Sequence, residues 1–172
     1  AVQSLVSSII NAFGSQEQKK RFLNELSSGE SIGAFMLTEQ HAGSDASKIA
    51  VKATRTRGHY ILSGTKQFVT SGSNAQVAIV FAVTNPSDGK RGISAFIVPT
   101  DIPGYRVSAV EKKLGQKCSD TAQIVFENLS LPADLLLGEE GEGYKIALSN
   151  LEGGRIAIAA QATGMAQSAL SE

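Results

Sequence analysis

Hydrophobic and polar positions at the start of the chain follow a helical period. A helix is predicted over residues 2–13, because apolar side chains recur there at near-helical spacing and Gly14 follows. A second helix is predicted after Ser15, whose spacing to Gln18 is that of a capping box, and Gly29 is placed to end it. The apolar stripe of this second helix consists of Phe22, Leu23 and Leu26. Both helices are short, so each needs a surface to pack against.

From residue 31 to about residue 137 the pattern changes to short runs rich in β-branched and aromatic residues. Gly, Pro, Asn, Asp and Ser separate these runs, as they do in turns between strands. The predicted strands are 32–38, 49–56, 59–66, 77–84, 93–99, 105–110 and 122–127. Strands at this spacing predict a β-barrel or a sandwich, and the lack of strand–helix alternation argues against a Rossmann fold.

A glycine-rich link at residues 138–143 leads into a long helical pattern that is rich in alanine. We therefore expect an α+β fragment: a mainly antiparallel β-barrel or sandwich middle domain, flanked by N-terminal helices and by the first helix of a C-terminal helical bundle. The expected divisions are residues 1–30, 31–137 and 138–172. The sequence lacks an initial Met and stops within a helical pattern, so we interpret it as a piece of a longer protein.

Composition narrows the classes of function. Sixteen basic residues balance sixteen acidic ones, which indicates neither a nucleic-acid binder nor a membrane-surface binder. No apolar run is long enough to cross a bilayer. Cys118 is the single cysteine, which excludes an internal disulfide and fits a reducing compartment. His41 and His59 stand apart, so no metal site is expected.

Residues 35–45 carry the most informative turn. An apolar stretch ends in Thr38-Glu39 and then turns through Ala42-Gly43-Ser44-Asp45. Such a turn gathers hydroxyl groups and free backbone N–H groups in one place, and Gly43 allows close approach of the backbone to a ligand. Clustered N–H groups suit an anion such as a pyrophosphate. Because Gly-Ser-Asp turns are common, this turn alone is a modest signal.

Several motifs in series resemble one flavoenzyme family. Residues 38–45 are followed by 64–72 (GTKQFVTSG), 90–99 (KRGISAFIVP) and 113–128 (KLGQKCSDTAQIVFEN), and finally by 141–155 (GEGYKIALSNLEGGR). This order of motifs resembles the acyl-CoA dehydrogenase family over essentially the whole chain, with short-chain and medium-chain members most similar. The sequence departs from the usual family pattern at four places, which are Met36, Gln40-His41, Phe68 (where most members carry Trp) and Glu152 (where Asp is more usual). Met36 and Phe68 are expected to affect the shape of the pocket.

The resemblance implies FAD-dependent α,β-dehydrogenation of an acyl-CoA thioester to the trans-2-enoyl-CoA, in fatty-acid or amino-acid catabolism. A carboxylate would remove the α-proton while a hydride leaves the β-carbon for the flavin. The electrons would pass to an electron-transfer flavoprotein. The family is usually tetrameric, and the compartment would be the bacterial cytoplasm or the mitochondrial matrix, which the sequence does not separate.

The resemblance also implies the roles of individual residues. Thr38 and Thr70 would hydrogen-bond the polar edge of the flavin, Phe68 would pack against its ring, and Ser44 would face the pyrophosphate or the CoA. The full set of implied cofactor-binding residues is Phe35, Leu37, Thr38, Gly43, Ser44, Phe68, Val69 and Thr70. The implied substrate-binding residues are Ser44, Glu152 and Arg155.

Taken singly, these residues have simpler interpretations. Thr38 and Thr70 suit strand ends, Ser44-Asp45 suits a capped turn, and Phe68 is by default a core aromatic. Arg155, which we expect to open a helix, would then be a surface cation. Cys118 is interpreted as a buried, inert thiol and His41 as a solvent-exposed side chain. Only the joint pattern favours function over these interpretations.

The catalytic base is not expected within the chain. A minority of the family place the catalytic Glu on the first bundle helix, immediately before the Arg, and Gly154 occupies that position here. The resemblance therefore implies a Glu beyond residue 172, so residues 1–172 should be inactive alone. It also implies that C-terminal helices of a neighbouring subunit hold part of the adenine end of FAD, so residues 1–172 should bind FAD weakly or not at all. Two alternatives remain open: an acyl-CoA oxidase or flavin monooxygenase-like relative, and a non-catalytic barrel that binds or assembles. Acyl chain length is not given by the sequence.

Overall fold

The computed structural model describes residues 2–171, and its N-terminal part is a pair of helices. Helix α1 (Val2–Phe13) and helix α2 (Gln16–Ser28) confirm the two predicted helices. The Ser15 hydroxyl accepts from the Gln18 N–H and the Gln18 side chain accepts from the Ser15 N–H, so the predicted capping box is present. Gly29 ends α2 with φ of 84°, the left-handed conformation that favours glycine.

The middle of the chain forms one mixed sheet of eight strands. Its strands are β1 (Gly33–Met36), β2 (Lys52–Thr56), β3 (His59–Thr70), β4 (Val77–Val83), β5 (Ile93–Pro99), β6 (Tyr105–Val110), β7 (Thr121–Pro132) and β8 (Leu136–Leu137). The strand order is β6-β7-β3-β2-β4-β5-β8, and β1 pairs with β4 beside β2. Three short 3-10 segments, η1 (Ala46–Lys48), η2 (Pro86–Gly92) and η3 (Ala133–Leu135), lie in the connections.

The sheet confirms the expected fold class, with differences in detail. Antiparallel pairs dominate, and only β1–β4 and β2–β4 are parallel. All seven predicted strands are present, whereas β8 was not predicted because two residues are too few to show a period. Strands β3 and β7 each run for 12 residues, longer than predicted, because they pair with each other along most of their length.

The core lies between the sheet and the helices. Strands β4 and β5 are buried along almost their whole length, as the continuous apolar run in β4 predicts. Helix α1 contacts β1, and two glutamine side chains fasten the helices to the strands. The Gln3 amide oxygen accepts from the Gly33 N–H at 2.8 Å, and the Gln18 amide donates to the Asp134 and Leu136 carbonyls.

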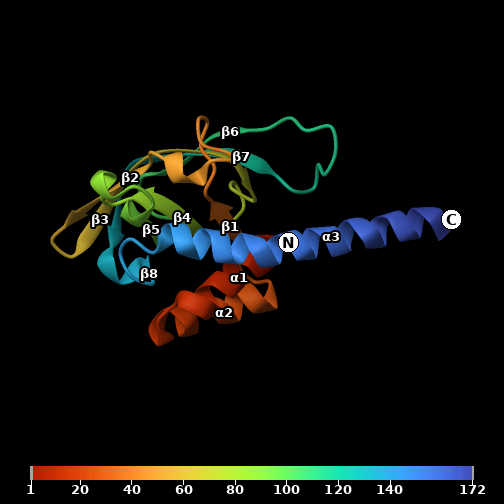
Figure 1. The fold of residues 1–172 in the computed structure, drawn as a ribbon, viewed down its shortest axis with the longest axis horizontal. Helices are drawn as coiled ribbons and strands as arrows, with labels where there is room; N and C mark the ends of the chain where they lie inside the picture. Colours follow the sequence, from red (N-terminus) through yellow and green to blue (C-terminus); the bar gives the residue numbers. More distant parts are fainter. Residues whose placement is uncertain (1, 172) are drawn as a thin grey trace.

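The C-terminal part of the chain is one long helix, α3 (Gly143–Ser171), which runs past the sheet and projects beyond it (Figure 1). Its first turns pack on β4 and β5, and Asn150 donates to the Leu5 carbonyl of α1 at 2.9 Å. From Arg155 onward every described residue is exposed, including the apolar Ile156, which is 72% exposed. Arg155 lies in the middle of α3, so the expectation that it opens a helix was wrong. Among residues 2–171, no helix combines the length and the hydropathy that a membrane span requires.

Candidate functional site

The ends of β1 and β3 meet at the predicted cofactor-binding residues. The Gln67 N–H donates to the Thr38 carbonyl at 2.9 Å, which places Thr38, two residues after the end of β1, directly beside β3. The chain then folds back at once, because Glu39 and Ala42 exchange two backbone hydrogen bonds of 3.0 Å. Thr38 is therefore held between a strand and a tight turn, so its backbone position is well defined.

Phe68 is the most unusual residue of this region. Its φ is 54°, and its side chain is 61% exposed. Positive φ is rare for a bulky residue and marks strain that the surrounding structure must maintain. The register between β3 and β7 shifts between Lys66 and Val69, which defines a β-bulge at this point. The interpretation of Phe68 as a core aromatic was wrong, because the bulge turns the ring out of the sheet.

Two threonine hydroxyls remain available for a ligand near the bulge: Thr70 follows it in β3, and Thr38 is joined to it through the Gln67 N–H. Thr38 and Thr70 are both half-buried, and among the described residues neither hydroxyl has a hydrogen-bond partner. The backbone of Thr70 is fixed by its pairing with Thr121. Half-buried hydroxyls on a fixed backbone can donate to a ligand at little entropic cost, since little needs to be ordered on binding.

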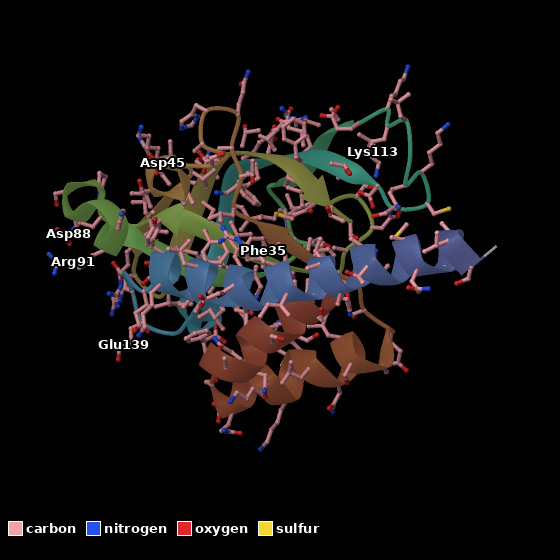
Figure 2. The ribbon with its side chains drawn as sticks, turned by 45° about the vertical axis from the view of Figure 1, so that its right-hand side comes forward. Phe35, Asp45, Asp88, Arg91, Lys113 and Glu139 are labelled. Carbon is pink, nitrogen blue, oxygen red and sulfur yellow. The ribbon has the colours of Figure 1, made fainter. Side chains whose placement is uncertain are left out.

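The turn after Glu39 is open to solvent. Gly43 and Ser44 are exposed, and a side chain built at Gly43 would meet no atom within 4 Å. Asp45 caps the 3-10 segment η1 through its hydrogen bonds from Ser47, and these bonds together with Lys48 lower the pKa of Asp45. The capping interpretation therefore holds for Asp45, whereas among residues 2–171 no capping hydrogen bond involves Ser44 or Gly43. In the view of Figure 2, Asp45 is seen toward the edge of the molecule.

The other three predicted cofactor-binding residues are mostly covered. Phe35 is half-buried against Phe81, with ring centroids 5.1 Å apart, and it is seen toward the middle of the molecule in Figure 2. Leu37 and Val69 are 7% and 2% exposed. Their side chains belong to the core, so any contact they make with a ligand must come from the backbone. Met36 is also in the core, at 1% exposed, so it cannot itself line an open pocket.

A buried ion pair that was not predicted from the sequence lies next to Thr38 and the bulge in β3. Lys66 is fully buried, and its Nζ donates to Glu39 Oε1 at 2.7 Å and to the Leu37 carbonyl at 3.0 Å. The Glu39 carboxylate also accepts from the Ala50 and Val51 N–H groups. Burial lowers the pKa of Lys66 to about 8, while the charge and hydrogen bond of Glu39 oppose that shift. The period-2 pattern of β3 indicates that Lys66 is buried, because Lys66 falls on the same face as Tyr60 and Leu62.

Glu152 and Arg155 lie in another part of the molecule. Both are exposed on α3, and Arg155 lines an apolar groove of about 770 Å³ between α1 and α3. None of the eight predicted cofactor-binding residues lines this groove. The structure thus brings the β1 and β3 residues together and leaves the two helical residues apart from them.

Two remaining sequence expectations have different outcomes. Cys118 is exposed, so its interpretation as a buried thiol was wrong. It lies in the connection between β6 and β7, which extends away from the sheet (Figure 1), so burial of the apolar side chain did not occur. The His41 side chain is 59% exposed, as predicted. Within residues 2–171, no group of three His, Cys, Asp or Glu side chains is placed to hold a metal ion.

Comparison with known proteins shows the same family over the region of the sheet. The family described as "Acyl-CoA dehydrogenase, middle domain" matches residues 34–129, which is more than half of the chain. An acyl-CoA dehydrogenase of Bacillus subtilis (strain 168) is 48% identical over 158 residues, which cover 92% of this chain and 42% of that protein. The chain thus spans less than half the length of the curated relative.

Two solved structures show that the fold is shared as well. The butyryl-CoA dehydrogenase of Megasphaera elsdenii superposes with a TM-score of 0.95 at 46% identity, covering 98% of this chain and 44% of that one. A glutaryl-CoA dehydrogenase of Mycobacterium smegmatis, solved in complex with FADH2, gives a TM-score of 0.80 at 39% identity, covering 88% of this chain and 38% of that one. The order of motifs, the mixed sheet and these likenesses lead to one conclusion: the chain belongs to the acyl-CoA dehydrogenase family.

Proposed function

We propose that the chain is the flavin-binding part of an enzyme that dehydrogenates short acyl-CoA thioesters to trans-2-enoyl-CoA, with FAD as cofactor. The observation that carries the proposal is the conformation of Phe68. A large aromatic side chain is held out of the sheet at φ of 54° and 61% exposed, close in sequence to the free hydroxyl of Thr70. An exposed ring adds nothing to the packing of the core, whereas a planar ring system bound against the sheet would pack on Phe68.

The residues present fit a flavin. Thr38 and Thr70 offer two half-buried hydroxyl donors without partners, which suit the polar edge of an isoalloxazine. Gly43 and Ser44 offer an open turn beside them, which suits the pyrophosphate or the CoA. When bound, FAD would supply the hydride acceptor. The butyryl-CoA dehydrogenase likeness favours a short acyl chain.

Each residue would have a separate role in such a reaction. Thr38 and Thr70 would donate hydrogen bonds that stabilise negative charge on the reduced cofactor, as fixed dipoles do in other enzymes. Phe68 would exclude water from one side of the ring. Glu152 and Arg155 would orient the substrate from α3. A carboxylate outside residues 1–172 would take the α-proton, because Gly154 occupies the position where some family members place that base.

The visible spectrum of the complete gene product tests the proposal, since the chain covers only 42% of its curated relative. The spectrum is recorded without oxygen before and after addition of butyryl-CoA. We expect bound flavin to bleach, and we expect Thr70→Val to shift the flavin spectrum and slow the bleaching. Thr65→Val is the matched control, because Thr65 is exposed on the same strand outside the bulge.

Other outcomes favour the alternatives. A yellow protein that does not bleach with butyryl-CoA would point to another substrate. Rapid reoxidation by oxygen, with slow transfer to an electron-transfer flavoprotein, would point to an oxidase or monooxygenase. A colourless protein that FAD cannot reconstitute would favour a non-catalytic barrel. We further propose that residues 1–172 alone lack dehydrogenase activity and bind FAD weakly or not at all; measurable turnover by this chain alone would contradict that proposal.

A further inference from the structure

The buried pair Glu39–Lys66 joins the two motifs that the proposed function assigns to the flavin. Glu39 directly follows Thr38, and Lys66 lies two residues before Phe68. The two side chains are 3% and 0% exposed and meet at 2.7 Å, whereas the pair Arg106–Glu127, at 2.6 Å, is half-exposed on both sides. Burying two charges has a desolvation cost that a surface ion pair largely avoids. The buried pair is therefore weak evidence of added stability, and we looked for another role.

The pair fixes the inward face of β3 at Lys66. In a regular strand, residues an even number of positions apart share a face, so Phe68 would point inward with Lys66. Instead, the buried residues of β3 at this point are Lys66 and Val69, which are separated by an odd number of positions. The register shift between them supplies the extra residue and turns the Phe68 ring outward.

The same pair fixes the neighbouring backbone. Lys66 Nζ donates a hydrogen bond to the Leu37 carbonyl. The Glu39 carboxylate accepts hydrogen bonds from the Ala50 and Val51 N–H groups. The residues on both sides of Thr38 are therefore held in place. The Gln67 N–H in the bulge donates to the Thr38 carbonyl. A change in the position of Lys66 would therefore alter the bulge and the position of Thr38 together.

We propose that Glu39 and Lys66 are positioning residues that set the bulge in β3 and thereby hold the Phe68 ring outward. The pair touches neither substrate nor cofactor; it acts through Phe68 and Thr38. This inference rests on the proposed function only in assigning the outward Phe68 ring to flavin binding. The geometric claim itself can be tested without flavin.

A single fluorescent reporter tests the geometry. The chain contains no Trp, so Phe68→Trp introduces one reporter at the bulge. In this background the emission is expected at long wavelength, with strong quenching by acrylamide, because the side chain is exposed. Adding Glu39→Gln and Lys66→Met together should shift the emission to shorter wavelength and lower the quenching constant by about half, as the strand regains regular alternation and residue 68 turns inward.

The double variant is chosen because a single change leaves one buried charge without its partner and could prevent folding. The matched control is Glu127→Gln, which removes a charge from the half-exposed pair with Arg106 and should leave the reporter unchanged. Circular dichroism verifies that each variant retains its strands. An unchanged reporter in a folded double variant overturns the proposal, as does an equal shift in the control.

Amide hydrogen exchange in the reporter protein keeps the proposal testable if the double variant does not fold. The Gln67 N–H should exchange as slowly as ladder amides of β3, because the pair holds it against Thr38. Exchange at the rate of an open loop would contradict the proposal. FAD binding by the complete gene product is measured separately, so that a failure of the proposed function is distinct from a failure of the positioning inference.

Discussion

Two regions of this chain carry predicted site residues, and they differ in how completely the chain itself fixes them. At the β1–β3 region, Thr38 and Phe68 sit above a buried ion pair, a tight turn and a bulge. On α3, Glu152 and Arg155 are exposed, and Arg155 lines the groove between α1 and α3. The first region is organised by contacts within the described residues, whereas the second lies on a helix whose described residues are all exposed from Arg155 onward. Substitutions of the same kind should therefore have very different effects in the two regions.

Replacing a cation by methionine should show the largest difference. Lys66→Met leaves the Glu39 carboxylate buried without its partner, and such changes typically cost about 3–5 kcal/mol of unfolding free energy. The same substitution at Arg155 removes an exposed cation for which no ion pair is described, and the expected change is within about 0.5 kcal/mol. Denaturant unfolding monitored by circular dichroism measures both. Equal effects of the two variants would contradict the comparison.

The stability of the chain should also depend on pH through Lys66. The pKa of Lys66 is about 8 when folded, below its ordinary value of 10.5, because burial disfavours the charged form. Between these values the unfolded chain binds more protons than the folded chain, so stability rises with pH, by about 3 kcal/mol over the whole interval.

Measurements for this pH prediction should end near pH 10. Burial and Glu140 raise the pKa of Tyr60 from 10.0 to about 12. Above about pH 10 the folded chain therefore keeps a proton that the unfolded chain loses, and stability falls as pH rises. The unfolding free energy is measured at about pH 7.5, 8.5 and 9.5, which lie around the lower part of the range between the folded and unfolded pKa values of Lys66. It should rise with pH in the parent chain. In Lys66→Met the rise should be absent. A parent curve that falls over this range would show that the folded-state pKa of Lys66 is not lowered.

Much of this organisation could be predicted from the sequence, and the reasons for the exceptions are physical. The capping box at Ser15 and the end of α2 at Gly29 depend on local hydrogen bonds, which a short segment determines by itself. The outward position of Phe68 depends on pairing with β7, and the burial of Lys66 depends on Glu39, 27 positions away in sequence. Such long-range partners leave no local period, so the default interpretation of an aromatic residue as core failed there.

Glycine-to-alanine substitutions should separate the two regions with opposite signs. Gly64 in β3 has φ of 137°, and a side chain there would lie 2.9 Å from Val51, so Gly64→Ala should cost about 1–3 kcal/mol. Gly153 in α3 meets no atom within 4 Å, so Gly153→Ala should instead favour the helix by about 0.5–1 kcal/mol. Thermal unfolding and helix content by circular dichroism measure the two effects. A destabilising Gly153→Ala would mean that α3 is covered where this structure leaves it open.

The smallest effect on stability is expected at the open turn, where function and fold can be separated within the β1–β3 region itself. Gly43 does not have a positive φ, and a side chain there meets nothing within 4 Å, so Gly43→Ala should change the unfolding free energy by less than about 0.5 kcal/mol. If a pyrophosphate approaches this turn as proposed, the added methyl group should nevertheless weaken FAD binding by the complete gene product.

Gly58→Glu is not a suitable control, because Gly58 has φ of 79° and would be strained by any side chain. Ser47→Ala changes the same loop without adding atoms and removes only the hydroxyl that bonds Asp45, so it should leave FAD affinity unchanged. Equal affinity of the parent and Gly43→Ala would place the pyrophosphate elsewhere, while the buried Glu39–Lys66 pair beneath the turn would keep its positioning role toward Phe68.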